Sequence, residues 1–144
     1  RAHGADLLML DARLETLVLE GLIERVHSLG MSAVVRARTR RDALIAVEAG
    51  ARIIAIDTRD PDTLAVDCGL FDQVTDVLPA QVVRIAAGGV QGPHDVMSFA
   101  RCGADVVLVG EAIIRSTDPQ QFVAELVAAG AHPALIPSAH REVL

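Results

Sequence analysis

Lysine is absent from this chain, and aromatic residues are nearly absent. All 13 cationic side chains are arginine, so there is no lysine amine to act as an acid, a base or a Schiff-base nucleophile. The chain has three phenylalanines and neither tryptophan nor tyrosine, although 51% of its 144 residues are hydrophobic. We therefore expect a core of Ala, Val, Leu and Ile. Intrinsic disorder is excluded, because it requires few aliphatic residues and a high net charge.

Cysteine, basic charge and long apolar runs are also scarce. The two cysteines lack CxxC spacing, and the five histidines lack the i, i+4 spacing of metal ligands, so we expect no zinc site, other metal or cofactor. The formal net charge of −6 argues against a nucleic-acid partner. No apolar run reaches the roughly 18 to 20 residues that span a membrane, and the N-terminus lacks the order of a secretory signal. We expect a soluble, cytoplasmic protein.

A short apolar run that follows the glycine end of a helix recurs along the chain. The clearest copies follow Gly4, Gly50 and Gly103, and weaker copies follow Gly30 and Pro79. A glycine in this place closes a helix in the left-handed conformation, and a continuous apolar run is typical of a strand buried on both faces of a parallel sheet. We predict five parallel strands, at about residues 6–11, 32–37, 52–57, 82–87 and 105–110.

Segments with helical spacing of apolar residues separate these runs, which predicts five strand–helix units joined by right-handed crossovers. Thr39 and Asp118 are residue types that cap a helix start. We expect one domain over residues 1–132 and an irregular extension over 133–144. Five units fit a flavodoxin-like, doubly wound open sheet, whereas a full barrel requires eight units and typically about 250 residues. Length alone favours the open sheet, but the motifs favour a barrel.

Two glycine motifs follow the fourth and fifth apolar runs. Gly88 and Gly89 lie where the fourth predicted strand ends, and Gly110 and Glu111 lie where the fifth ends. Adjacent glycines let main-chain amides approach a phosphate closely, an arrangement that many barrel enzymes use. Each motif alone also fits a plain tight turn. Together they predict a cradle for phosphate or a phosphorylated small molecule.

Charged residues follow the second and third predicted strands. Asp57 and Arg59 lie at the carboxyl end of the third strand, where the site of an α/β protein is expected. Arg36 ends the second strand and is followed by three more arginines, a set that could form an anion funnel for a phosphorylated ligand. The alternative interpretation of Asp57 and Arg59 is a surface ion pair, and that of the arginines after Arg36 is a solvated helix face.

These stretches together resemble indole-3-glycerol phosphate synthase, the barrel lyase of tryptophan biosynthesis. The resemblance covers about residues 2–130 and looks like the fourth to eighth strand–helix units of the family. It rests on GADLLML, on GARIIAIDTRDPDTLAVD and on AAGGVQGPHDVMSFARCGADVVLVGEAIIRSTDP. The resemblance implies a partial TIM (β/α)8 barrel and a carboxy-lyase that closes the indole ring.

The residues that match the family are those with which the family binds the phosphate group of its ligand. By this resemblance the phosphate-binding glycines fall on Gly89 and Gly110, Glu111 often supplies a further amide, and Arg59 matches an arginine of the sixth-strand loop. The positions that carry the family's catalytic residues hold different residues in this chain. A fifth-strand glutamate is replaced by Arg36, a sixth-strand asparagine by Asp57, and a Glu-Ser pair by Ala87-Gly88. The catalytic lysines belong to segments that this sequence does not contain.

Three hypotheses follow. The chain keeps phosphate-ligand binding with incomplete catalytic residues, or it is a structural half-barrel module that self-associates, or it is a different phosphate-binding barrel enzyme that uses Asp57 as its base. Both outer strands of a five-strand barrel segment lack a neighbour, and their apolar runs lack the lysine or proline that protects natural edges. We therefore expect a homo-oligomer that assembles through these edges.

Overall fold

The computed structural model describes residues 1–59 and 68–132. Strands and helices alternate through the described part of the chain, with two helices after the last strand. The elements are β1 (Leu7–Asp11), α1 (Thr16–Ser28), β2 (Ser32–Ala37), α2 (Arg40–Glu48), β3 (Ile53–Asp57), α3 (Cys68–Thr75), β4 (Val83–Ala87), α4 (Pro93–Arg101), β5 (Val106–Leu108), α5 (Glu111–Arg115) and α6 (Pro119–Gly130).

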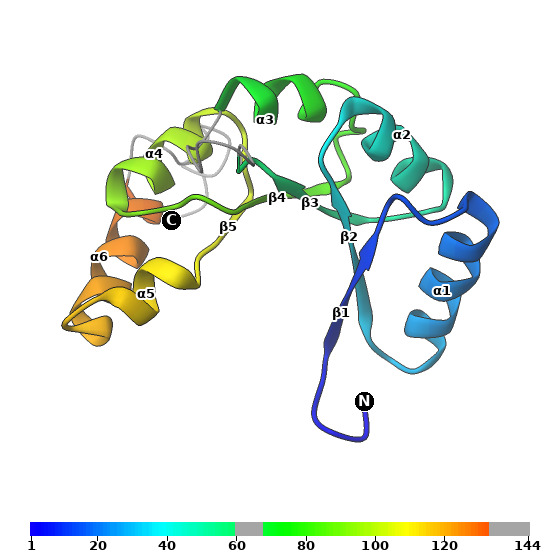
Figure 1. The fold of residues 1–144 in the computed structure, drawn as a ribbon, viewed down its shortest axis with the longest axis horizontal. Helices are drawn as coiled ribbons and strands as arrows, with labels where there is room; N and C mark the ends of the chain where they lie inside the picture. Colours follow the sequence, from blue (N-terminus) through cyan, green and yellow to red (C-terminus); the bar gives the residue numbers. More distant parts are fainter. Residues whose placement is uncertain (60–67, 133–144) are drawn as a thin grey trace, which may run out of the picture.

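The five strands form one parallel sheet in the order β1-β2-β3-β4-β5. This sequential order confirms the predicted barrel segment, and the flavodoxin-like alternative, which requires a shuffled order, is wrong. The helices lie along the convex side of the curved sheet, and its concave side is open (Figure 1). Within the described residues the sheet does not close on itself, so the fold is a partial barrel.

Local sequence signals set the boundaries of these elements. Gly50 and Gly103 have φ of 82° and 86°, which confirms that left-handed glycines end the helices before β3 and β5. The Thr39 hydroxyl accepts a hydrogen bond from the Asp42 amide, and the Asp42 side chain accepts one in return, so α2 begins with a capping box. Asp118 caps α6 by accepting from the Gln121 amide. The expected extension over 133–144 lies outside the described residues.

The sheet contributes to two apolar layers. On its outer face, aliphatic strand residues such as Val35, Ile54 and Ile56 pack under the helices and are fully buried. Phe71 and Phe99 join this layer and contact each other edge to face, with ring centroids 5.6 Å apart. The inner layer is smaller and consists of Val34, Ala55 and Ala87, with Ile53 and Ile85 against them. None of the described helices has the length and apolarity to cross a bilayer.

Candidate functional site

The carboxyl ends of the first three strands carry one repeated pattern. Each has a charged residue, a small residue and an arginine, in Asp11-Ala12-Arg13, Arg36-Ala37-Arg38 and Asp57-Thr58-Arg59. The middle residue is fully buried in all three copies. Because alternate residues of a strand share a face, the flanking charged side chains lie on the opposite face, which is the concave side of the sheet. The pattern builds a charged rim where β1, β2 and β3 end.

Asp11 lies between two arginines at the β1 end of this rim. Its Oδ1 accepts from Arg13 Nε at 3.0 Å, and its Oδ2 accepts from Arg13 Nη2 at 3.0 Å and from Arg36 Nη2 at 2.6 Å. Hydrogen bonds from Arg13 and then from Arg36 hold the pKa of Asp11 well below its usual value. The carboxylate is 29% exposed. Arg36 is therefore bound to the neighbouring strand, β1.

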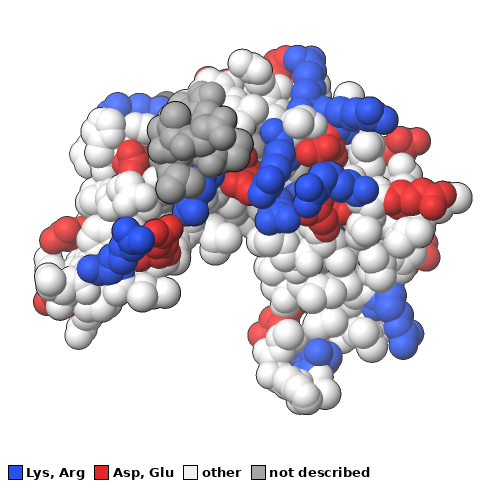
Figure 2. Space-filling model, viewed as in Figure 1, with Lys and Arg blue, Asp and Glu red and all other residues white. Residues whose placement is uncertain are grey.

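Asp57 on β3, two strands from Asp11, is also paired with an arginine. Arg38 donates to its Oδ2 from Nε at 3.2 Å, Arg38 Nη2 lies 3.0 Å from the same oxygen as an ion pair, and the Arg59 amide lies 3.4 Å from its Oδ1. The Asp57 side chain is 18% exposed. Blue and red atoms meet over this region in Figure 2, as expected for charges that are mutually paired.

The loop after β4 packs closely against Asp57. Gly88 has φ of 87°, and a Cβ at this position would lie 3.0 Å from Asp57 Oδ1 and 3.3 Å from Arg59 Cβ. The fully buried Thr58 hydroxyl lies 3.3 Å from the carbonyl oxygens of Ala87 and Gly88, to which it donates. Glycine is required at position 88 both by the backbone conformation and by this close approach.

A pocket of about 310 Å³ lies between the loops that follow β4 and β5. Its lining residues are Arg59, Gly88, Gly89, Val90, Gln91, Leu108, Val109, Gly110 and Glu111. Glu111 is paired with two arginines: its Oε2 lies 3.2 Å from Arg59 Nη2, and its Oε1 lies 2.9 Å from Arg115 Nη2. The pocket lining thus combines glycine backbone with one arginine, Arg59. The one carboxylate in the lining, that of Glu111, is paired with arginines.

The structure brings most of the predicted site residues together. Arg59, both glycines of the β4 loop, Gly110 and Glu111 line this one pocket, and Asp57 borders it through Gly88. Arg36 lies apart, two strands away from β4, in contact with Asp11.

Sequence reasoning missed four residues of the rim: Asp11, Arg13, Arg38 as the partner of Asp57, and Thr58. The repeated charged–small–Arg pattern at three strand ends was the signal that could have identified them. Among residues 1–59 and 68–132, no three His, Cys, Asp or Glu side chains are grouped so that they could hold a metal ion.

Comparisons with known proteins agree with this architecture. A family model described as Indole-3-glycerol phosphate synthase matches residues 1–126. Indole-3-glycerol phosphate synthase of Beutenbergia cavernae is 54% identical over 136 residues, which are 94% of this chain and 50% of that protein. Indole-3-glycerol phosphate synthase 1 of Streptomyces coelicolor is 48% identical over 136 residues, 94% of this chain and 51% of that protein. The chain spans about half the length of the curated relatives it matches.

Solved structures show the same fold at low sequence identity. The 3-hexulose-6-phosphate synthase of Salmonella typhimurium superposes with a TM-score of 0.75 at 23% identity, covering 90% of this chain and 63% of that one. The thiamine phosphate pyrophosphorylase of Pyrococcus furiosus gives 0.71 at 17% identity, covering 88% of this chain and 59% of that one. These two likenesses concern the fold alone.

Proposed function

Because this chain belongs to the indole-3-glycerol phosphate synthase family, we propose that it forms the fourth to eighth strand–helix units of such a barrel and binds the phosphate group of a phosphorylated ligand. The observation that carries the proposal is the pocket between the β4 and β5 loops. Its lining includes Gly88, Gly89 and Gly110 together with Arg59, and backbone amides and guanidinium groups are among the groups that bind phosphate in proteins.

Glu111 is the member of this pocket whose charge opposes an anion. Its carboxylate is turned toward Arg59 and Arg115, so both its oxygens are paired and its repulsion of a phosphate is reduced. An anion that enters the pocket competes with Glu111 for Arg59. We therefore propose that Arg59 contacts the bound ligand. Glu111 is the residue that the ligand displaces from Arg59.

We propose further that the chain by itself does not close the indole ring at a competent rate. Ring closure with loss of carbon dioxide requires an acid at the attacked carbonyl and a base for the later proton. Arg36 is bound to Asp11, Asp57 is bound to Arg38, and Ala87 carries no ionisable group. The family fills these three positions with Glu, Asn and Glu, and a single lost acid or base removes typically about 10² to 10⁴ in rate.

A second candidate function is a different phosphate-binding barrel reaction in which Asp57 is the base. It is favoured by the place of Asp57 next to Gly88, at the edge of the pocket. The ion pair between Arg38 and Asp57 Oδ2 weighs against it, because Arg38 already occupies this carboxylate oxygen. In this second candidate function, Asp57 and Arg59 are the catalytic residues.

Calorimetric titration with inorganic phosphate and with the family's substrate tests the proposal. We expect both to bind, and we expect the substrate to remain unconverted. Gly110→Asp adds a charge at an open position of the pocket and weakens phosphate binding by about fivefold or more, because two unit charges 4 Å apart interact by about 1 kcal/mol even in water. Gly21→Asp adds the same charge on α1, where a Cβ also meets nothing within 4 Å, and leaves binding unchanged.

Three results would each contradict part of the proposal. Equal phosphate affinity in Gly110→Asp and the unsubstituted chain would move the phosphate site elsewhere, and so would unchanged affinity in Gly89→Asp. Rapid formation of indole-3-glycerol phosphate by the purified, lysine-free chain would contradict the loss of catalysis.

A further inference from the structure

The pocket between the β4 and β5 loops contains one cation and one anion. Among the nine described residues that line it, Arg59 and Glu111 are the charged ones, and they are paired with each other at 3.2 Å. Their charges cancel, so the lining as a whole is neutral. Asp57, which borders the pocket through Gly88, is already paired with Arg38. A fully ionised oxyanion that enters therefore adds its negative charge beside a carboxylate, with a single guanidinium to offset both.

Glu111 has a second partner, which keeps it beside the pocket. Arg115, one turn further along α5, lies 2.9 Å from Glu111 Oε1 and is not one of the lining residues. An anion that binds Arg59 therefore frees only Oε2. In the described part of the chain the partner of Oε2 is Arg59, so its displacement leaves this acceptor without a donor, directly beside the incoming anion.

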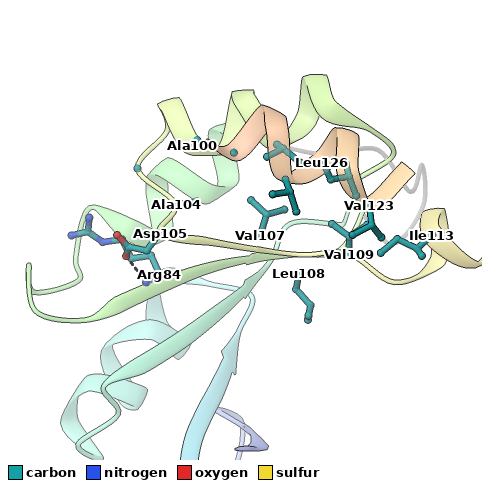
Figure 3. A pocket seen from close by; sticks show the side chains of 14 residues that line it. Arg84, Ala100, Ala104, Asp105, Val107, Leu108, Val109, Ile113, Val123 and Leu126 are labelled. Carbon is teal, nitrogen blue, oxygen red and sulfur yellow. Dashed lines mark hydrogen bonds between the residues drawn. The ribbon is translucent and has the colours of Figure 1, made fainter. Parts of the chain in front are cut away.

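The rest of the lining offers little that could replace Arg59 on Glu111 Oε2. Leu108 and Val109, on the β5 side, are apolar, and Figure 3 shows that they point to opposite sides of the strand end. The glycines contribute backbone only. Gln91 carries the one other side-chain donor among the described lining residues, and it is exposed. Because an ionised carboxylate only accepts hydrogen bonds, the bound group itself has to supply the missing proton.

We propose that the pocket binds its phosphate group together with one proton, which lies between a phosphate oxygen and Glu111 Oε2. The phosphate hydroxyl donates to Oε2, and the other phosphate oxygens accept from Arg59 and from glycine amides. Glu111 is thus a specificity residue, which favours an oxyanion with a proton over one without. The proposal rests on the phosphate site proposed above and adds to it the protonation state of the bound group.

Three anions differ in whether they bring this proton. Inorganic phosphate carries at least one proton at neutral pH, whereas sulfate carries none. A phosphate monoester has a second pKa of about 6, so it is mostly a proton-free dianion at pH 7 and has to take up a proton from solvent when it binds. The three anions share a tetrahedral head of similar size, so differences between them report on the proton.

Calorimetric titration of the chain with inorganic phosphate and with sulfate, at pH 7 and equal ionic strength, is the first test. We expect phosphate to bind at least about tenfold more tightly than sulfate, because a hydrogen bond to a charged group is made with one anion and lost with the other. Equal affinities would overturn the shared proton and leave the phosphate site standing. Absence of phosphate binding would overturn the proposed function and the shared proton together.

Glu111→Gln keeps the size of the side chain and removes its charge. The Glu111 side chain is 46% exposed, so we expect the fold to be unchanged, and circular dichroism checks this. A glutamine amide can donate to an oxyanion that has no proton. Sulfate therefore gains more affinity than phosphate does, and the two affinities come to within about threefold of each other. A preference for phosphate as strong as that of the unsubstituted chain would overturn the role of Glu111.

Two further variants separate Glu111 from its surroundings. Glu20→Gln makes the same change at an exposed position of α1 that does not line the pocket, and it should keep the preference for phosphate. Gln91→Met removes the other side-chain donor of the lining and should change both affinities by the same factor. Loss of the preference in Glu20→Gln would show that the net charge of the chain causes it. Its loss in Gln91→Met would assign the contact to Gln91, and either result overturns the proposal.

Proton uptake provides a test that does not depend on sulfate. Methyl phosphate, a monoester with no other hydroxyl, is titrated at pH 7 in two buffers of different ionisation enthalpy, and the difference in observed enthalpy gives the number of protons taken up. The charged groups that face Glu111 are Arg59 and Arg115, and arginine keeps its charge at this pH. We expect an uptake of about one proton per bound ligand in the unsubstituted chain and none in Glu111→Gln. Equal uptake by the two, including none in either, would overturn the shared proton.

Discussion

Gly88→Ala tests the most constrained contact of the candidate site. A Cβ at position 88 meets two penalties: the left-handed φ of 87°, and contacts of 3.0 Å to Asp57 Oδ1 and 3.3 Å to Arg59 Cβ. The left-handed conformation costs an L-residue about 1 to 2 kcal/mol. The carboxylate cannot move away without disturbing its pairing with Arg38, which adds about 1 kcal/mol for a partly buried charged hydrogen bond. We expect a total loss of about 2 to 3 kcal/mol in the free energy of unfolding.

Gly50→Ala is the matched control for this experiment. Gly50 has φ of 82°, and a Cβ there would meet nothing within 4 Å, so the variant carries the conformational penalty alone, about 1 to 2 kcal/mol. Urea unfolding at one fixed protein concentration measures both variants, and phosphate titration then reports on the pocket. We expect weaker phosphate binding in Gly88→Ala and unchanged binding in Gly50→Ala. Equal losses of stability, together with equal phosphate affinities, would refute the close approach of the β4 loop to Asp57.

Three further substitutions test the rim and the pocket. Asp11→Asn should destabilise the fold by about 1 to 2 kcal/mol at pH 7. The folded-state pKa of Asp11 is lowered, so its stabilisation is present above the unfolded value near 4 and is lost as the pH falls below it; a difference from the unsubstituted chain that is equally large at pH 2 in urea unfolding would contradict this. Glu111→Gln should raise phosphate affinity roughly fivefold, because it removes a negative charge and releases Arg59, and calorimetry that showed weaker binding would exclude this role for the carboxylate. Thr58→Val should lower the unfolding free energy by about 1 kcal/mol through loss of its hydrogen bonds to the β4 loop, whereas unchanged stability would show that these bonds contribute nothing.

The strand positions were predictable because the apolar runs are continuous, and those of β2, β3 and β5 follow a glycine at a helix end. At Gly50 and Gly103 the glycine fixes where the helix stops, and the strand begins three residues later. The sequential strand order was not determined by this periodicity, since an open sheet uses the same units. It was predicted from the motifs after β4 and β5, where a phosphate cradle is typical of barrels.

The glycines of the pocket were predictable, and the ion pairs of the rim were not. Gly88 and Gly89 alone also fit a plain tight turn, and only their combination with Gly110 after the next strand pointed to one shared pocket. Arg36 and Asp57 were identified as charges, but their partners depend on register. Asp11 aligns with Arg36 across β1 and β2, and a single sequence does not state which strands are neighbours until the fold is known.

The rim and the pocket are built from different kinds of groups. The pocket that we propose for phosphate is lined by three glycines together with Arg59. The rim depends on matched charges: Arg36 pairs with Asp11, and Arg38 pairs with Asp57. A glutamate at position 36 would face Asp11 as a like charge, which destabilises neighbouring strands. Restoring an acid–base group at that position therefore requires a compensating change at position 11, because the two residues now function as one pair.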